Sequence, residues 1–338
     1  MTASAVADPA LLPFKLDLVG RRVLWLRLSA AQRRQAAFLD ERALPKDAQG
    51  GWMPMESLHD PGPTHAPAAA AIFHIGHCGS TLLSRLLESW PQVQCLREPL
   101  PLRTLADAWP QLAMPQSRLD PRQAPDLLRD LWTRWSQPLL PARRSVVKAS
   151  SSCNGLIAPL LAQEPKLQAI LLDMPLRPYL ATLLKAPGSV MDAAHAAGGR
   201  LQVLQADGFA EGEALHAMSL PEQCAMGWLA ERVRFDRLCA GDGRVLRVDF
   251  EDLLMSPDAS LQTIARHLSL DQPGVAAAMA SPAWGRYSKA QDHDYGREAR
   301  AMDLALAIQR HGGEIEAGLA WVAACVRRYP ELQAIAGQ

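Results

Sequence analysis

One apolar segment constrains the fold of this chain more than any other. Residues Ala68 to Ile75 form an apolar run interrupted only by His74 and ended by Gly76, and such a run predicts a strand buried in a parallel sheet. Beyond Gly79, leucines recur at the spacing of one helical face, at positions 82, 83, 86 and 87. The sequence therefore predicts a buried strand that passes through a short turn directly into a helix.

The turn has the composition of an anion-binding site. It ends at the start of the helix and contains two glycines and two hydroxyl side chains, Gly76, Gly79, Ser80 and Thr81. Because the first N–H groups of a helix lack partners within it and the helix dipole adds positive charge there, this position suits a phosphate or a sulfate group. A nucleoside-triphosphate loop needs G-x-x-x-x-G-K-[ST]. Here the glycines are too close together and no lysine precedes Ser80, which disfavours nucleoside-triphosphate hydrolysis.

The turn resembles the 5′-phosphosulfate loop of sulfotransferases, in which a strand leads through P-[KR]-S-G-T-T-x-[LM] into a helix. Residues Cys78 to Thr81 stand at the S-G-T-T positions, and His77 occupies the basic position. The alternative is an ordinary strand–turn–helix connection that uses glycines for close packing. A short motif alone leaves both interpretations open.

Four further segments resemble sulfotransferase motifs and follow in the family's order. Cys95–Leu100 resembles the Y-E-P-L element of carbohydrate sulfotransferases, and Ser145–Lys148 resembles a strand that ends in K-T-H, with Lys148 at the lysine and Ser150 at the histidine. Lys166–Leu184 resembles the strand and R-D-P-R-D-x-x-x-S element, and Arg244–Leu254 resembles V-x-Y-E-D-L-x-x-D-P. The chain is thus identified as a divergent member of the sulfotransferases that use 3′-phosphoadenosine 5′-phosphosulfate (PAPS).

The resemblance implies an α/β fold, rich in helix, with a parallel sheet flanked by helices as in P-loop-like sulfotransferases. Residues 1–66 would form an N-terminal extension packed on the core, and residues 67–338 the sulfotransferase-like domain. The implied reaction transfers a sulfuryl group from PAPS to a hydroxyl or an amine of an unidentified acceptor. Two alternatives stay open: a binding module that has lost use of the donor, and a nucleotide-dependent, kinase-like enzyme.

The resemblance also implies roles for individual residues. The donor's 5′-phosphosulfate would lie on Gly76, His77, Cys78, Gly79, Ser80 and Thr81. Lys148 and a protonated His77 would stabilise charge on the bridging oxygen, and Glu98 would remove the acceptor's proton. Met174 replaces the family's 3′-phosphate arginine. The expected substitutes are Arg177 and Thr182, with Arg286, Ser288 and Lys289 from a basic C-terminal loop. The mechanism implied requires no metal.

Composition narrows the class of partner. The 35 lysines and arginines are balanced by 35 aspartates and glutamates, which argues against a nucleic acid as the principal partner. Six cysteines are scattered without C-x-x-C pairing, as expected of reduced thiols. The chain has no signal-peptide pattern and no apolar run of ~20 residues, so we expect a cytoplasmic protein without a membrane span. The sequence does not reveal the acceptor or the oligomeric state.

Periodicity predicts several further elements. A strand is expected at residues 21–28, and helices at 30–39, 221–238 and 303–326, with an interrupted helical region at 103–135. The glycines between Asp192 and Leu220 suggest a mobile segment, and Pro282–Arg297 is expected to be a polar loop. In an α/β sheet, ligands bind beyond the carboxyl ends of the strands. Gly76, Lys148 and Met174 are each predicted at such an end.

Overall fold

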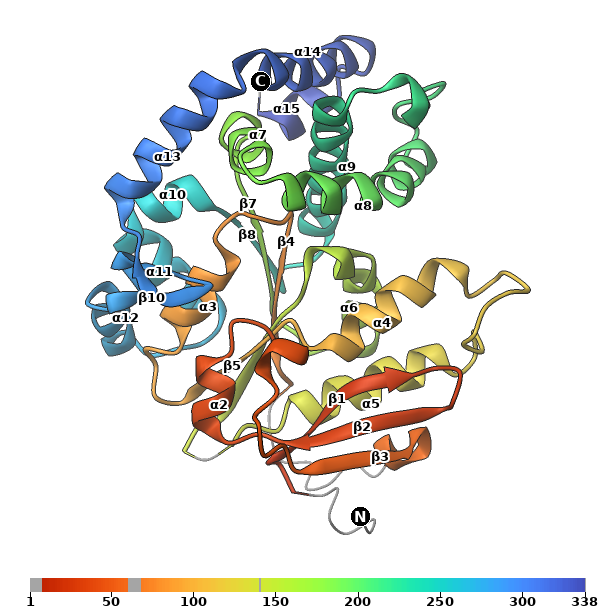
Figure 1. Ribbon diagram of the computed structural model, residues 1–338, viewed down its shortest axis with the longest axis vertical. Helices are drawn as coiled ribbons and strands as arrows, with labels where there is room; N and C mark the ends of the chain where they lie inside the picture. Colours follow the sequence, from red (N-terminus) through yellow and green to blue (C-terminus); the bar gives the residue numbers. More distant parts are fainter. Residues whose placement is uncertain (1–7, 60–67, 140, 338) are drawn as a thin grey trace.

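The computed structural model describes residues 8–59, 68–139 and 141–337. A parallel sheet of five strands runs through the middle of the molecule (Figure 1), in the order β5-β6-β4-β7-β8. Each strand is five residues long: β4 (Ala70–His74), β5 (Val93–Arg97), β6 (Arg144–Lys148), β7 (Ala169–Asp173) and β8 (Val245–Asp249). The predicted α/β class with a parallel sheet flanked by helices is confirmed.

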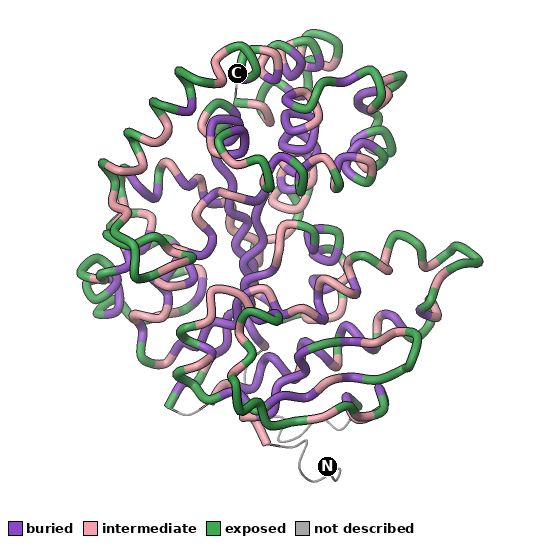
Figure 2. The backbone as a smooth tube through the Cα atoms, in the orientation of Figure 1, coloured by how far each residue is buried: buried purple, intermediate pink, exposed green. Residues whose placement is uncertain are grey.

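The apolar composition of the strands follows from their burial. Every residue of β4, β5 and β7 is buried, because helices cover both faces of the sheet (Figure 2). Pairing is parallel throughout, with Ile72 of β4 opposite Lys148 of β6 on one side and Ile170 of β7 on the other. All five carboxyl ends therefore lie at the same edge of the sheet, where the chain passes from strand into turn.

A smaller antiparallel sheet precedes the central one. It consists of β1 (Leu11–Asp17), β2 (Arg22–Arg27) and β3 (Gly50–Pro54), in that order. Helix α2 (Ala30–Gln35) and the short 3₁₀ helices η1 (Glu41–Ala43) and η2 (Met55–Leu58) complete this region. Strand β1 packs on helices α4 (Leu100–Ala108) and α5 (Ala124–Trp135), and its leucines belong to the same hydrophobic cluster as the central strands. The predicted strand at residues 21–28 and helix from residue 30 are both present, although the helix ends earlier than expected.

The remaining elements surround the central sheet. Before β8 these are α3 (Ser80–Leu87), α4 (Leu100–Ala108), η3 (Trp109–Gln111), α5 (Ala124–Trp135), η4 (Ser151–Leu156), α6 (Ile157–Gln163), α7 (Leu176–Leu184), α8 (Pro187–Ala206), η5 (Leu215–Ala217) and α9 (Leu220–Gly241). After β8 come α10 (Phe250–Met255), α11 (Pro257–His267), α12 (Pro273–Met279), η6 (Pro282–Gly285), the hairpin β9 (Arg286–Tyr287) and β10 (Ala290–Asp294), α13 (Arg297–Arg310), α14 (Gly312–Arg328) and α15 (Leu332–Ala336).

Helix α9 shows how local sequence sets an element's start. Ser219 and Glu222 form a reciprocal capping box, and Pro221 occupies the first turn, where its missing N–H costs nothing. The helix predicted at 221–238 is therefore confirmed. None of the helices within the described ranges combines the length and apolarity needed to cross a membrane. All six cysteines are free, and five of them are buried.

Three expectations about the second half of the chain are wrong. Residues 192–220 are largely helical rather than a mobile segment, because α8 buries an alanine-rich face with Ala193 and Ala197 against α9. Residues 282–297 contain the β9–β10 hairpin, not only loop. The helix expected at 303–326 is two helices, α13 and α14, separated at His311.

Candidate functional site

A pocket of about 730 Å³ lies at the carboxyl edge of the central sheet. The segments after β4, β5, β6 and β8 contribute Gly76, Glu98, Ser150 and Phe250 to its wall, and the β9–β10 hairpin closes one side. Eight lysines and arginines line the pocket: Arg42, Arg103, Lys148, Lys185, Arg286, Lys289, Arg297 and Arg300. Only two carboxylates, those of Glu98 and Asp192, accompany them. The pocket therefore suits an anionic ligand.

The predicted anion-binding turn forms part of this wall. Gly76, His77 and Gly79 all have positive φ angles, of 93°, 53° and 76°, so the chain curls tightly before α3. The N-cap of α3 is Gly79, and among the described residues no side chain caps the first turn. Ser80 and Thr81 are the first residues of α3 and line the pocket. Their backbone N–H groups therefore face the pocket. The turn has the geometry expected of an oxyanion cradle.

Gly79 is required by packing as well as by backbone conformation. A β-carbon at this position would lie 2.0 Å from the ring of Phe250. Phe250 follows β8, and the guanidinium of Arg300 lies 5.2 Å from the centre of its ring. Replacing Gly79 would therefore disturb the end of β8 as well as the turn. If such a variant lost ligand binding, the loss could come from the altered turn or from the displaced end of β8.

Cys78 is directed away from the pocket. Its side chain is buried, and its thiol donates to the carbonyl oxygen of Leu172 at 3.3 Å. Burial raises the pKa of this thiol to about 12, so Cys78 is an uncharged packing residue at neutral pH. Of the six predicted turn residues, the other five line the pocket and Cys78 does not.

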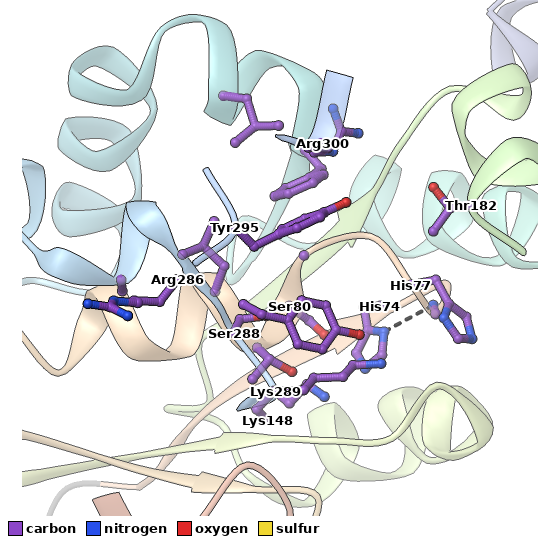
Figure 3. Close-up of a pocket in the computed structure, with 18 of the residues that line it drawn as sticks. His74, His77, Ser80, Lys148, Thr182, Arg286, Ser288, Lys289, Tyr295 and Arg300 are labelled. Carbon is purple, nitrogen blue, oxygen red and sulfur yellow. Dashed lines mark hydrogen bonds between the residues drawn. The ribbon is translucent and has the colours of Figure 1, made fainter. Parts of the chain in front are cut away.

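In the ligand-free protein His77 is not the cation that the resemblance implied. Burial, with the neighbouring positive charge of Lys289 as the second cause, lowers the pKa of His77 to about 4. The imidazole is thus neutral at physiological pH. His74 is neutral as well, since its Nδ1 accepts from the Gly76 N–H and its Nε2 donates to the carbonyl oxygen of Ala149, both at 3.0 Å. His74 holds the turn in place, and Figure 3 shows its bond to the turn beside His77.

The predicted base and the predicted cation contact each other. The ammonium group of Lys148 donates to Oε1 of Glu98, while Arg103 donates to Oε2 of Glu98 at 3.2 Å. Glu98 has a positive φ of 52° and follows β5, so the backbone turns its side chain towards β6. Lys148 is 1% exposed, and burial lowers its pKa while Glu98 opposes that shift. Glu98 is therefore paired with Lys148, and not with Arg97, which is paired with Glu88.

Among the described residues, Lys289 is the pocket cation whose charge has the fewest protein partners. Of the pocket's eight cationic side chains, Arg42, Arg103, Lys148, Lys185, Arg286 and Arg300 have carboxylate partners. Within the described part of the chain neither Lys289 nor Arg297 has one, but Arg297 donates to the carbonyl oxygen of Leu254. Its Nζ lies 5.9 Å from the centre of the Phe38 ring, as does Nζ of Lys148. The two ammonium groups lie beside the start of α3 in Figure 3.

Arg85 connects the hairpin to the anion-binding helix. Its Nε donates to the carbonyl oxygen of Ser288 at 2.7 Å, and its two terminal nitrogens donate to the carbonyl oxygens of Arg34 and Gln35 at 3.5 and 3.4 Å. Burial lowers its pKa to about 10, which leaves it charged at neutral pH. One side chain therefore links α3, the end of α2 and the turn that carries Lys289.

The candidates for a second phosphate site divide into two groups. Thr182, Arg286, Ser288 and Lys289 line the pocket, but Arg177 does not. Arg177 lies on the outside of α7, where it is paired with Glu316 of α14 at 2.8 Å, so its prediction as a ligand residue is wrong. Met174 is fully buried, and its carbonyl oxygen accepts from the indole of Trp228 at 2.9 Å. The residue at the family's arginine position thus belongs to the core.

Several pocket residues escaped the sequence analysis. They come from segments outside the motifs: Phe38, Arg42, Arg103, Ser189, Asp192, Trp284, Tyr287, Tyr295, Arg297 and Arg300. Phe38 and Arg42 belong to residues 1–66, so the N-terminal region forms part of the pocket wall. A signal existed for the hairpin region, where Trp284, Tyr287 and Tyr295 alternate with arginines and a lysine. Aromatic rings mixed with cations are typical of nucleotide-binding surfaces.

No cluster of three or more His, Cys, Asp or Glu side chains that could hold a metal ion occurs among the described residues.

No protein-family model matches the sequence, and no curated protein matches it. Solved structures with a similar chain path are sulfotransferases. A sulfotransferase domain from the curacin biosynthetic pathway is 14% identical, with 76% of this chain and 98% of that chain covered and a TM-score of 0.42.

Two further structures give similar values. Sulfotransferase STF1 from Mycobacterium tuberculosis H37Rv is 16% identical, with 74% of this chain and 78% of that chain covered and a TM-score of 0.39. Mouse sulfotransferase SULT7A1, solved in complex with PAP, is 12% identical, with 63% of each chain covered and a TM-score of 0.35. At these values the likeness is one of chain path. Which reaction the pocket supports has to be argued from its residues.

Proposed function

We propose that the protein is a sulfotransferase that uses PAPS as its donor. The observation that carries the proposal is the union of three features in one pocket: an uncapped helix N-terminus after a glycine turn, a buried lysine on the adjacent strand, and an excess of cationic side chains. A helix N-terminus binds phosphate and sulfate groups equally well. The turn lacks the lysine of a nucleoside-triphosphate loop, which favours phosphosulfate over triphosphate chemistry.

The donor's groups fit the chemistry of the wall. The 5′-phosphosulfate would accept from the N–H groups and hydroxyls of Ser80 and Thr81, next to Lys148. Lys289 has no carboxylate partner in the described ranges and supplies positive charge for a further phosphate group. It would thereby replace the 3′-phosphate arginine of the family, whose position Met174 occupies in this chain. The rings of Trp284, Tyr287 and Tyr295 offer faces on which a purine base can stack.

The pairing of Lys148 with Glu98 is compatible with catalysis by both. An ammonium group has three N–H donors, so Lys148 retains two after bonding Glu98. A carboxylate has about four acceptor sites, so Glu98 retains room for the acceptor's hydroxyl beside Lys148 and Arg103. The pair fixes both groups before any ligand arrives, which removes the cost of orienting them during the reaction.

The proposed step is an in-line transfer. The acceptor oxygen forms a bond to sulfur as the bond between sulfur and the donor's bridging oxygen breaks, and Lys148 stabilises the charge that grows on that oxygen. The acceptor's proton passes to Glu98. The products are a sulfate ester and adenosine 3′,5′-bisphosphate. As in phosphoryl transfer, the protein contributes positioning and charge stabilisation, not covalent chemistry.

Calorimetric titration tests the proposal. The purified protein is titrated with adenosine 3′,5′-bisphosphate, ADP and ATP under the same conditions. Binding of the bisphosphate at least tenfold tighter than either nucleotide supports a PAPS-dependent enzyme. Equal or tighter binding of ATP would favour a kinase-like activity instead. Binding of none of the three would favour a module that has lost use of the donor.

A further inference from the structure

A second pocket, of about 360 Å³, opens from the first. Seven residues line both pockets and mark their junction: Gly76, His77, Arg103, Ser150, Ser151, Ser189 and Asp192. The second pocket continues between α4, which contributes Asp107, and α8, which contributes His195 and Arg200. In Figure 1, α8 lies above α4 on the same side of the molecule.

The position of the second pocket matches that of an acceptor. If the donor's phosphosulfate lies on the turn before α3, the sulfuryl group points towards the residues shared by the two pockets. Glu98 lines the first pocket beside Arg103, which lines both. An acceptor held in the second pocket would therefore present a hydroxyl at the junction, beside Glu98, the proposed base.

The wall of the second pocket is hydroxylated. Ser150, Ser151, Ser152 and Ser189 line it together with Tyr179. Tyr179 is only 2% exposed, and its hydroxyl has no hydrogen-bonding partner among the described residues although it borders the pocket. The hydroxyl oxygen itself is not among the fully buried atoms, so it is open to the pocket and can bond to a ligand or to water. The wall thus favours a ligand with several hydroxyls over a flat apolar one.

The charged side chains of the second pocket differ in whether they are paired. Its two arginines have carboxylate partners outside it: Arg103 is paired with Glu98 at 3.2 Å, and the buried Arg200 with Glu231 at 3.1 Å. Each of these two carboxylates also holds a second cation. The two carboxylates that line the pocket, Asp107 and Asp192, form no hydrogen bond or ion pair within the ranges that the structure describes. The charged groups of this pocket that lack a partner are therefore both acidic, and they can pair with a cationic group of a ligand.

We propose that the acceptor is a small hydroxylated amine, such as an amino alcohol or an amino sugar. This inference rests on the proposed sulfotransferase function. The ammonium group lies near Asp107 and Asp192, the hydroxyls contact Tyr179 and the serines, and one hydroxyl reaches the junction for transfer. A volume of about 360 Å³ is at the lower end of small-molecule sites, which excludes a polymer chain lying wholly inside the pocket.

Three sugars with one ring and different charges test the inference: D-glucosamine, D-glucose and D-glucuronate. Each is titrated, alongside a set of small amino alcohols, into protein saturated with adenosine 3′,5′-bisphosphate. We expect D-glucosamine to bind at least about tenfold more tightly than D-glucose, which has the same shape and no charge. D-glucuronate should bind most weakly. Raising the salt concentration should reduce the preference, because both carboxylates are exposed to solvent.

Charge-removing variants give the control. Asp107→Asn and Asp192→Asn keep the shape of the side chain and should each weaken amine binding about tenfold, with little change for glucose. Asp107 lines only the second pocket, so Asp107→Asn should leave bisphosphate affinity unchanged. Asp126→Asn, an exposed aspartate of α5 that lines neither pocket, should change nothing.

Two results would overturn the inference while the proposed function stands: tighter binding of the acid than of the amine, or no binding of any amine by protein that binds the bisphosphate. A protein that does not bind the bisphosphate would overturn the proposed function, and the acceptor assignment with it. Transfer of radiolabelled sulfuryl from the donor to the best-bound amine, with the product analysed by mass spectrometry, identifies the hydroxyl that reacts.

Discussion

The two pockets share a wall but differ in which of their charged side chains lack a partner. Of the eight cationic side chains that line the larger pocket, Lys289 and Arg297 have no carboxylate partner in the described ranges. The smaller pocket has two arginines that are already paired and two aspartates that are not, and one of these, Asp192, lines both pockets. The unpaired groups therefore favour an anionic ligand group in the larger pocket and a cationic one in the smaller.

The comparison also separates two ways of building a site. The larger pocket depends on backbone features at strand ends, namely the positive φ angles of Gly76 and Gly79 and the uncapped start of α3. The smaller pocket depends on side chains from α4, η4, α7 and α8 that meet only in the folded protein. Substitutions in the first region should affect donor and acceptor alike, whereas those in the second should affect the acceptor alone.

The largest effect is expected at Glu98, which lines the larger pocket beside the junction residue Arg103. Glu98→Gln keeps the size of the side chain and removes its capacity to accept a proton, so transfer should fall by ~10²–10⁴-fold. Bisphosphate affinity should change little, because the donor's contacts lie on the turn and the cations. Radiolabelled transfer and calorimetry measure the two quantities. Glu56→Gln, at an exposed position of η2, is the matched control. Undiminished turnover by Glu98→Gln would move the base elsewhere.

Lys148→Met should reduce turnover by ~10²–10³-fold, because it removes the cation at the bridging oxygen. The substitution also leaves Glu98 with Arg103 as its remaining partner, so thermal unfolding should be recorded in parallel. Lys15→Met is the control, since Lys15 forms an exposed ion pair far from the motifs in sequence. Wild-type turnover in Lys148→Met would show that charge on the leaving group is stabilised by another cation.

Lys289→Ala and Arg177→Ala sharpen the boundary of the larger pocket. A charge-assisted contact contributes ~1.5–3 kcal/mol, so Lys289→Ala should weaken bisphosphate binding by about 10- to 150-fold. The affinity for adenosine 5′-phosphosulfate, which lacks the 3′-phosphate, should change much less. Arg177→Ala should alter neither affinity, because Arg177 lies outside the pocket. An equal loss for both ligands in Lys289→Ala would contradict a 3′-phosphate role.

The smallest effect is expected from the charge state of His77. With a pKa of about 4, the imidazole stays neutral between about pH 5 and 8, so wild type and His77→Gln should have turnover–pH profiles of the same shape in that range. Unfolding should restore the ordinary pKa of 6.5, and protonation would then favour the unfolded state. The contribution to stability is therefore complete above pH 6.5 and is lost as the pH falls towards 4. NMR titration of His77 measures the pKa directly.

The sequence predicted best those site residues whose position depends on a local backbone feature, such as a strand end or a glycine turn. The strand before Gly76, the turn and α3 are local in the chain, so periodicity and glycine placement predicted them. Likewise, Lys148 ends one strand and Glu98 directly follows another. Contacts between distant segments were not predictable. Arg177 was assigned to the site because it lies three residues beyond Met174, at the start of a helix, yet the first turn of α7 directs it towards Glu316 of α14.

The error at His77 has a similar origin. A histidine beside an anion site is expected to be protonated, but its pKa is set by burial and by Lys289, which is more than 200 residues away in the sequence. The second pocket was missed for the same reason. Its aspartates stand on α4 and on α8, and the latter segment appeared from its glycines to be mobile. Net charge of a pocket is a property of assembled side chains, which no local pattern encodes.

The links made by Arg85 have a consequence for the kinetics of turnover. Among the residues that the structure describes, the hairpin that carries Lys289 is held to α3 by one hydrogen bond, from Arg85 to Ser288, and its β9 strand is only two residues long. A wall held in this way can separate more readily than the sheet edge behind it, whose strands are paired along their length. Under the proposed function, loss of the bond between Arg85 and Ser288 should therefore shorten the residence time of a bound nucleotide.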